Sequence, residues 1–301
     1  MDSKILIFYI MNLQMLTRIV GNLPSIWNRI TYFKPFLSDN PPPSKNIITT
    51  LRPNRNNTEM KITITNNEQL FDDTAAWRII GQILWKKDSV IGLSTGRTTG
   101  NMHRTVVKIY REHPFDISNV TFFGQDEVVN VPREYSGSCW KMLKTELIDD
   151  IGTDDRHFLM LPVKSDNYRK DCQKFTEELD SRGGIDLLIV GIGENGHIGF
   201  NQPGSSFGST CRVSDMYPEL EERIRRETGT PDNVSLGGVT LGLKDIMSAK
   251  RIVAVAKGAN KSDIVKRIVE GPVNEDTPAS ILQLHPDCEL LLDMTAASKL
   301  D

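Results

Sequence analysis

The chain of 301 residues contains only four cysteines, and none of them forms a Cys-x-x-Cys pair. They are scattered over the sequence at Cys139, Cys172, Cys211 and Cys288. This spacing is typical of reduced thiols in a cytoplasmic protein rather than of a disulfide framework or a zinc site. The five histidines also lack any partner at metal-ligand spacing, so the sequence indicates no metal centre.

Long hydrophobic runs and an excess of positive charge are absent as well. The apolar run from Ile5 to Met11 is far too short to cross a membrane, and no clear cleavage site of a secretory signal follows it. The net charge of −3 argues against a nucleic-acid-binding protein, which normally presents a basic face or arm. The hydrophobic content of 39% is that of an ordinary globular protein. We therefore expect neither a membrane nor a nucleic acid as a partner.

The segment before Met60 differs from the rest of the chain. Three prolines at residues 41–43 and the polar run at residues 52–57 are typical of a linker. Lys and Arg outnumber Asp and Glu in this segment, which leaves an organelle-targeting role open. We expect residues 1–59 to be a poorly ordered extension, or the product of a start codon placed too early, and residues 60–301 to form one domain.

From Met60 onward, short apolar runs alternate with longer amphipathic ones. The expected strands are residues 61–65, 90–94, 120–124, 157–161, 185–192, 251–256 and 289–293, and the expected helices are residues 68–85, 99–110, 139–147, 168–179 and 261–269. The run at 185–192 is almost entirely Ile, Leu and Val, which is typical of a strand buried on both faces. Strands alternating with helices predict an α/β, Rossmann-like domain with a mainly parallel sheet and helices on both faces.

Three segments with chemically useful side chains follow expected strands, where ligands of such sheets bind. The first opens a helix and comprises Ser94, Thr95, Gly96, Arg97 and Thr98. Backbone N–H groups and hydroxyls at a helix start bind anions, and Arg97 adds a charged fork of donors. The segment lacks the Gly-Lys-Ser/Thr ending of a nucleotide P-loop. A plain turn with a threonine cap is the alternative interpretation.

The second segment contains two adjacent acids, Asp126 and Glu127. A carboxylate just past a buried strand is a candidate general base. Adjacent side chains point apart, so we expect at most one of the two to face a substrate. A solvated acidic turn is the alternative.

The third segment runs from Gly191 to Gln202 and contains a Gly-x-Gly-x-x-Gly pattern. A dinucleotide-binding fingerprint requires a helix that opens at the third glycine. Here His197 follows at once, and Pro203 breaks any helix. Glycines around a single histidine instead suggest a backbone folded tightly against a small ligand, with His197 as a catalytic candidate.

Four motifs together resemble one family. The run from Gly193 to Pro203 resembles the signature of glucosamine-6-phosphate deaminase/isomerases, a family of the 6-phosphogluconolactonase-like superfamily. The pair Asp126-Glu127, the loop of residues 94–98 and the segment from Leu282 to Pro286 are similar to further motifs of that family. The resemblance extends from Met60 to the end of the chain.

The resemblance implies the conversion of glucosamine 6-phosphate to fructose 6-phosphate and ammonia in amino-sugar catabolism, without a metal or organic cofactor. By match, Asp126 moves the proton between C2 and C1, and His197 assists ring opening. The implied catalytic set is Asp126, His197, Asn195 and Gln202. The implied substrate-binding set is Ser94, Thr95, Gly96, Arg97, Thr98, Glu127, Gly196, Arg226 and Lys261. Relatives range from monomers to hexamers, which leaves a homo-oligomer open.

Three positions depart from the family pattern. Most members carry Glu where Gln202 stands, and loss of that charge predicts a lower pKa of His197 and weaker ring opening. Arg97 replaces a glycine that is usual in the best-known members. Ser214 stands where the N-acetylglucosamine-6-phosphate effector site has a lysine, beside matching residues Ser205 and Arg212, so we expect weak or no activation.

Other functions stay open at this point. Lactonases of the superfamily usually follow the histidine with Thr-Ala-Ser, whereas Ile198-Gly199-Phe200 follows here, which favours the deaminase branch. A sugar-phosphate sensor without turnover is a third hypothesis, and Gln202 is the feature that supports it. The sequence does not separate glucosamine from galactosamine 6-phosphate. Arg226 lies in a charged run, so a solvated helix face is its alternative interpretation.

Overall fold

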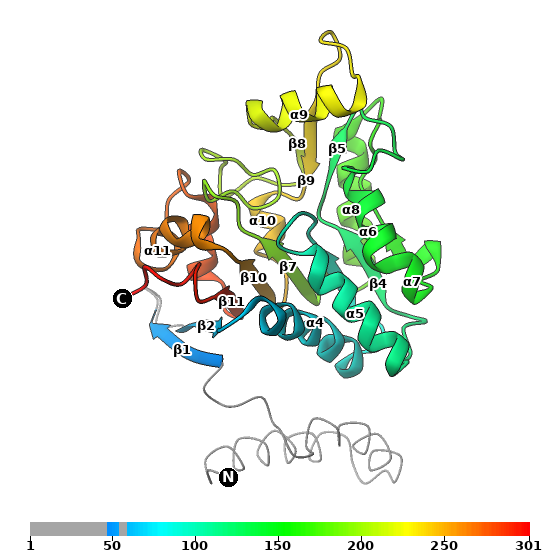
Figure 1. Ribbon diagram of the computed structural model, residues 1–301. Helices are drawn as coiled ribbons and strands as arrows, with labels where there is room; N and C mark the ends of the chain where they lie inside the picture. Colours follow the sequence, from blue (N-terminus) through cyan, green and yellow to red (C-terminus); the bar gives the residue numbers. More distant parts are fainter. Residues whose placement is uncertain (1–46, 54–58) are drawn as a thin grey trace. The chain divides into compact units, whose positions relative to one another are not determined.

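The computed structural model describes residues 47–53 and 59–301 (Figure 1). Its main sheet has eight strands in the order β1-β2-β11-β10-β7-β3-β4-β6. All neighbouring strands of this sheet run parallel except β1 and β2. The strand bounds are β1 (Ile47–Pro53), β2 (Glu59–Thr65), β3 (Val90–Leu93), β4 (Thr121–Gly124), β6 (Phe158–Leu159), β7 (Leu187–Gly191), β10 (Ile252–Ala256) and β11 (Cys288–Asp293). The prediction of a mainly parallel sheet is confirmed.

Helices cover both faces of this sheet, as predicted. On one face lie α4 (Glu68–Trp85), α5 (Gly100–Glu112), α6 (Cys139–Leu143), the π-helical turn η2 (Lys144–Ile148) and α7 (Asp149–Ile151). On the other face lie α8 (Tyr168–Ser181), α10 (Leu243–Ile246) and α11 (Ser262–Glu270). Strand β7 explains this two-sided burial, because Leu188 and Val190 enter one core while Leu187 and Ile189 enter the other. Each such fully buried side chain stabilises the fold by about 1.5–3 kcal/mol.

Strand β1 lies in the segment that the sequence assigned to the extension before Met60. It pairs antiparallel with β2, with Ile48 opposite Ile64. The β-branched run Ile47-Ile48-Thr49-Thr50 favours a strand, and an edge position tolerates Pro53. The sheet therefore begins earlier than expected. The expectations for residues 1–46 and 54–58 lie outside the described residues.

A second, antiparallel sheet was not predicted. It contains β5 (Asp126–Val129), β9 (Gly237–Thr240) and β8 (Arg212–Ser214), and it is grouped with α9 (Pro218–Thr228) in Figure 1. Its own small core consists of Val128, Val131, Phe200, Met216, Ile224 and Leu236. Two acids at the start of β5 mask its strand character, and its partner β9 lies far along the chain, so local pattern did not reveal it.

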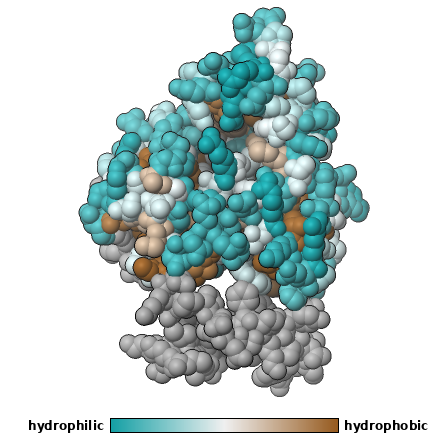
Figure 2. All heavy atoms as spheres, in the orientation of Figure 1, coloured by the Kyte–Doolittle hydropathy of each residue, from teal (hydrophilic) through white to brown (hydrophobic). Residues whose placement is uncertain are grey.

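The remaining elements are short 3₁₀ turns: η3 (Asp155–His157), η4 (Ala259–Lys261) and η5 (Pro278–Leu284). No helix among the described residues is long and apolar enough to cross a membrane. The face seen in Figure 2 is mainly hydrophilic, with apolar residues confined to scattered areas.

Candidate active site

Ser94 ties the three predicted segments together at the carboxyl edge of the sheet. Its hydroxyl accepts hydrogen bonds from Gln125 Nε2 at 2.7 Å and from the backbone N–H of Gly191 at 3.1 Å. The same hydroxyl donates to the carbonyl of Ile189 at 2.8 Å. Ser94 is 3% exposed, so its hydroxyl joins β3, β7 and the start of β5 instead of reaching outward to a phosphate. The sequence assigned it to the phosphate loop, and the structure gives it this internal role.

Asp126 is the first residue of β5 and has the environment of a general base. Its side chain is 8% exposed, and burial raises its pKa to about 7. The thiol of Cys139 lies 3.5 Å from Oδ1. A Cβ atom on Gly199 would lie 3.3 Å from Oδ2, so only glycine there leaves this oxygen uncrowded. A carboxylate with a pKa near 7 both accepts and returns a proton at neutral pH.

Glu127 points away from Asp126, as the alternation of a strand requires. It is fully buried, and its Oε1 accepts the backbone N–H groups of Val128 at 2.7 Å and Cys139 at 2.9 Å. Its Oε2 accepts the N–H of Trp140 at 2.7 Å. The carboxylate therefore fixes the first turn of α6, where helical N–H groups lack partners. The two carboxylates therefore lie on opposite sides of the strand, and that of Glu127 is occupied by the start of the helix. That at most one of the two acids faces a substrate stays a prediction.

His197 is held in one orientation by Asn195. Asn195 Oδ1 accepts the backbone N–H of His197 at 3.1 Å and lies 2.7 Å from its Nδ1. A backbone N–H only donates, so the amide oxygen faces the imidazole and Nδ1 carries the hydrogen. The lone pair of Nε2 is then available to take a proton from a substrate hydroxyl. Gly193 is required beside this ring, because a Cβ atom there would overlap it.

The electrostatic environment keeps His197 neutral. Burial and, to a smaller extent, the positive charge of Lys261 lower its pKa to about 4, against the opposing effect of Glu194. The ring stacks on Tyr217, with 5.8 Å between centroids and an interplanar angle of 29°. A neutral imidazole at pH 7 acts as a proton acceptor.

Gln202 reaches His197 through Asn195. Its Oε1 accepts from Asn195 Nδ2 at 3.1 Å, so the two amides and the imidazole form a relay. The missing carboxylate at residue 202 predicted a lowered pKa for His197. The direction of the shift agrees, but its main cause is burial rather than the missing carboxylate.

The phosphate loop and Lys261 supply positive charge at the same edge. The loop turns at Gly96, whose φ of 118° suits glycine, and leads into α5 with Arg97 exposed. Lys261 Nζ donates to the carbonyl of Ile192 at 2.8 Å. Burial lowers the pKa of Lys261, and the positive charge of Arg97 adds to this effect. Two cations that repel each other are stabilised by an anion between them.

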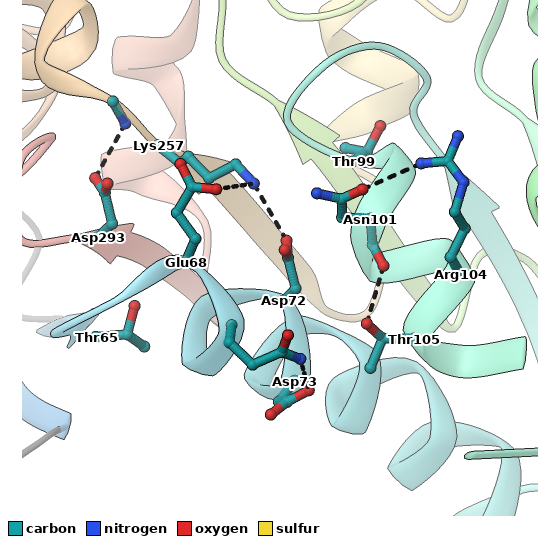
Figure 3. A network of polar contacts seen from close by, with 12 residues as sticks. Thr65, Glu68, Asp72, Asp73, Thr99, Asn101, Arg104, Thr105, Lys257 and Asp293 are labelled. Carbon is teal, nitrogen blue, oxygen red and sulfur yellow. Dashed lines mark hydrogen bonds and ion pairs between the residues drawn. The ribbon is translucent and has the colours of Figure 1, made fainter. Parts of the chain in front are cut away.

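Lys257 also lies at this edge but is already paired. Its Nζ is 3.4 Å from Asp72 Oδ1 and 3.9 Å from Glu68 Oε2, both on α4 (Figure 3). Figure 3 also shows the first turns of α5, where Arg104 donates to Asn101. Among the described residues, Lys261 has only the carbonyl of Ile192 as a direct partner, so it is the better candidate for a phosphate.

Arg226 lies in the last turn of α9, the helix grouped with the second sheet (Figure 1). It is exposed on α9, and its side chain makes no ion pair or hydrogen bond with any other described residue. The solvated helix face is its observed environment. Ser205 and Arg212, which match part of the family's effector motif, are joined by a hydrogen bond in which Arg212 Nη2 donates to Ser205 Oγ at 3.2 Å.

The C-terminal motif has a packing role. Gln283 Nε2 donates to the carbonyl of Ile268 at 2.7 Å, and His285 Nε2 lies 2.8 Å from the carbonyl of Ala249. Both side chains are buried and join η5 to neighbouring elements. The described residues contain no cluster of three or more His, Cys, Asp or Glu side chains that is able to hold a metal ion.

Two site residues were missed by the sequence. Cys139 was noted only as a reduced thiol, and Tyr217 was not noted at all. Tyr217 precedes Pro218 at the start of α9, and a tyrosine before a helix carries no signal of stacking on a distant histidine.

The carboxyl edge of the parallel sheet thus presents a carboxylate with a pKa near 7, an oriented imidazole and two neighbouring cations, Lys261 and Arg97. This combination defines an acid–base site for a small anionic substrate. A family model described as glucosamine-6-phosphate isomerases/6-phosphogluconolactonase matches residues 76–290. The chain belongs to this family.

Individual relatives agree with the family match. A glucosamine-6-phosphate deaminase of Clostridium botulinum is 35% identical over 242 residues, covering 80% of this chain and 99% of the relative. One of Halothermothrix orenii is 34% identical over 241 residues, covering 80% of this chain and 100% of the relative.

Solved structures show the same fold. A monomeric glucosamine-6-phosphate deaminase matches with a TM-score of 0.74 and 30% identity, covering 80% of this chain and 100% of that one. A 6-phosphogluconolactonase from Trypanosoma brucei matches with a TM-score of 0.63 and 20% identity, over 81% of this chain and 100% of that one. At this lower identity the likeness concerns the fold alone.

Proposed function

We propose that this chain is an enzyme that converts glucosamine 6-phosphate to fructose 6-phosphate and ammonia in amino-sugar catabolism. The observation that carries the proposal is the pairing of a buried base, Asp126, with the imidazole of His197, whose Nε2 has no hydrogen-bond partner in the part of the chain that the structure describes. Gly199, two residues after His197, lies against Asp126 Oδ2, which places both groups around one short turn. The names of the similar relatives support the choice of substrate.

The chemistry follows from these two groups. His197 Nε2 takes the proton of the C1 hydroxyl while the C1–O5 bond breaks, and the protonated imidazole returns a proton to O5 to complete ring opening. Asp126 then removes the proton from C2 of the open-chain aldehyde and delivers it to C1. O1 gains a proton and the amine nitrogen loses one, which leaves a C1 hydroxyl and an imine at C2. Water adds to this imine, and ammonia leaves as the ketone of fructose 6-phosphate forms. Each step is an acid–base step with side chains that the site contains.

The buried base favours this reaction over lactone hydrolysis. A proton moved between two carbons must be kept from exchanging freely with water, and Asp126 is only 8% exposed. Lactone hydrolysis requires only an activated water. The absence of Thr-Ala-Ser after His197 points the same way.

The test is to incubate the purified protein with glucosamine 6-phosphate and to measure ammonia and fructose 6-phosphate in equal amounts. Galactosamine 6-phosphate and 6-phosphogluconolactone serve as parallel substrates. Ammonia release from glucosamine 6-phosphate supports the proposal. Tight binding without ammonia release supports the sensor hypothesis, and hydrolysis of the lactone alone refutes the proposal.

A further inference from the structure

Cys139 contacts the proposed base and the proposed phosphate loop at once. It is the first residue of α6 and is 4% exposed. Its Sγ lies 3.5 Å from Asp126 Oδ1 and 3.2 Å from Thr95 Oγ1. Thr95 stands between Ser94 and the glycine turn of the loop. A hydrogen-bonded chain from Thr95 through Cys139 to Asp126 thus links two parts of the site that come from different strands.

The position of the thiol is fixed from its own backbone. The N–H of Cys139 donates to Glu127 Oε1 at 2.9 Å, and Ser138 caps the same helix by accepting the N–H of Lys141 at 3.1 Å. The two adjacent acids therefore both bind Cys139. Glu127 accepts its backbone N–H, and Asp126 contacts its thiol. This geometry gives the thiol little freedom to turn away from the carboxylate.

The thiol acts as a hydrogen-bond donor. Burial and the neighbouring carboxylates raise the pKa of Cys139 well above its ordinary value, so it stays protonated and is a poor nucleophile. Its S–H donates to Asp126, and its sulfur accepts from the Thr95 hydroxyl. Oδ1 of Asp126 is thereby occupied, whereas Oδ2 faces the turn at Gly199, which has no side chain.

We propose that Cys139 is the positioning residue of the base. Its thiol holds Asp126 Oδ1, so that Oδ2 is the oxygen that carries the proton. Thr95, which contacts the same thiol, couples this contact to the phosphate loop. The proposal rests on the proposed function. No part of it requires Cys139 to touch the substrate.

The contact has a measurable consequence for the pKa of Asp126. The thiol donates to the charged carboxylate and lowers the pKa against the effects of burial and of Glu127. The residues that face Asp126 from β9 and from the turn after β7 are Thr240 and Gly199, which carry no charge. Removing the thiol therefore raises the pKa, and a hydroxyl in its place keeps or strengthens the donor.

The experiment compares Cys139→Ala, Cys139→Ser and Thr95→Val with the wild type, and Cys288→Ala serves as the control for loss of a buried thiol. The pH profile of kcat/KM for ammonia release from glucosamine 6-phosphate is measured for each. We expect the acid limb of Cys139→Ala to move up by roughly half to one pH unit, with KM changed less than about twofold. Thr95→Val should move the acid limb in the same direction by a smaller amount. Neither Cys139→Ser nor the control Cys288→Ala should move the acid limb upward.

Titration of the Asp126 carboxyl by ¹³C NMR, assigned with Asp126→Asn, gives a readout that does not depend on turnover. If the wild type releases no ammonia, the proposed function fails, while the NMR titration still tests the contact. An unchanged midpoint in Cys139→Ala, or an upward shift of the same size in Cys139→Ser, overturns the inference.

Discussion

Asp126 and Glu127 are adjacent acids that lie on opposite sides of β5 and have different roles. Among residues 47–53 and 59–301, the Asp126 carboxylate has one hydrogen-bond partner, the Cys139 thiol, and its burial raises its pKa to about 7. Glu127 accepts three backbone N–H groups. Both side chains are carboxylates, so their different hydrogen-bond partners determine which one acts as the base and which one holds the helix.

The first prediction concerns the pH dependence of the reaction. The base must be deprotonated, so kcat/KM should rise with pH through about 7, the pKa of Asp126. His197, with a pKa near 4, is neutral over this range and adds no second rise. A profile that is flat between about pH 6 and 8 would exclude Asp126 as the titrating base.

Restoring the charge at residue 202 is the second prediction. Gln202→Glu places a carboxylate beside Asn195, which favours protonated His197 and raises its pKa. We expect ring opening, and hence kcat/KM at pH 7, to increase about two- to tenfold. Gln173→Glu, on the exposed face of α8, adds the same charge elsewhere and should have no effect. Equal rates for both variants would contradict the relay through Asn195.

The two lysines at the carboxyl edge provide the third prediction. Lys261→Ala removes a charge-assisted contact to the phosphate, so KM should rise about 10- to 100-fold. Lys257→Ala removes the partner of Asp72 and should lower the free energy of unfolding with little change in KM. Steady-state kinetics and urea unfolding of both variants check this, and a larger KM effect for Lys257→Ala would reverse the assignment.

Stability at low pH provides the fourth prediction. Glu289 is 1% exposed and forms ion pairs with Arg78, Lys61 and Arg251. Against the effect of burial, Arg78, Lys61 and the hydrogen bond from Thr63 lower its pKa from 4.5 to about 2. A depressed carboxyl pKa stabilises the fold above the unfolded value and loses this effect as pH falls from 4.5 to about 2.

Glu289→Gln should therefore lower the free energy of unfolding at pH 7 by roughly 3 kcal/mol, because it leaves partly buried cations without their partner. It should also flatten the loss of stability between pH 4.5 and 2, since Gln does not titrate. Urea unfolding at several pH values checks both effects. A variant as stable as the wild type at pH 7 would contradict this role for Glu289.

The sequence predicted the parallel sheet because its strands are continuous apolar runs, and β7 shows why: both of its faces are buried. It did not predict the second sheet, because β5, β8 and β9 are short and pair over long separations. In the site, the glycines around His197 predicted that this histidine is a catalytic candidate. The internal role of Ser94 and the contact between Cys139 and Asp126 depend on tertiary packing, which neither composition nor spacing reports.

The central claim is that Asp126 removes the proton from C2. The most direct measurement follows loss of deuterium from C2 of glucosamine 6-phosphate labelled there, in the wild type and in Asp126→Asn, with Asp166→Asn on the exposed surface as the control. We predict that Asp126→Asn removes the label about 10³-fold more slowly than the wild type and the control. Removal of the label at the wild-type rate by Asp126→Asn would contradict the account.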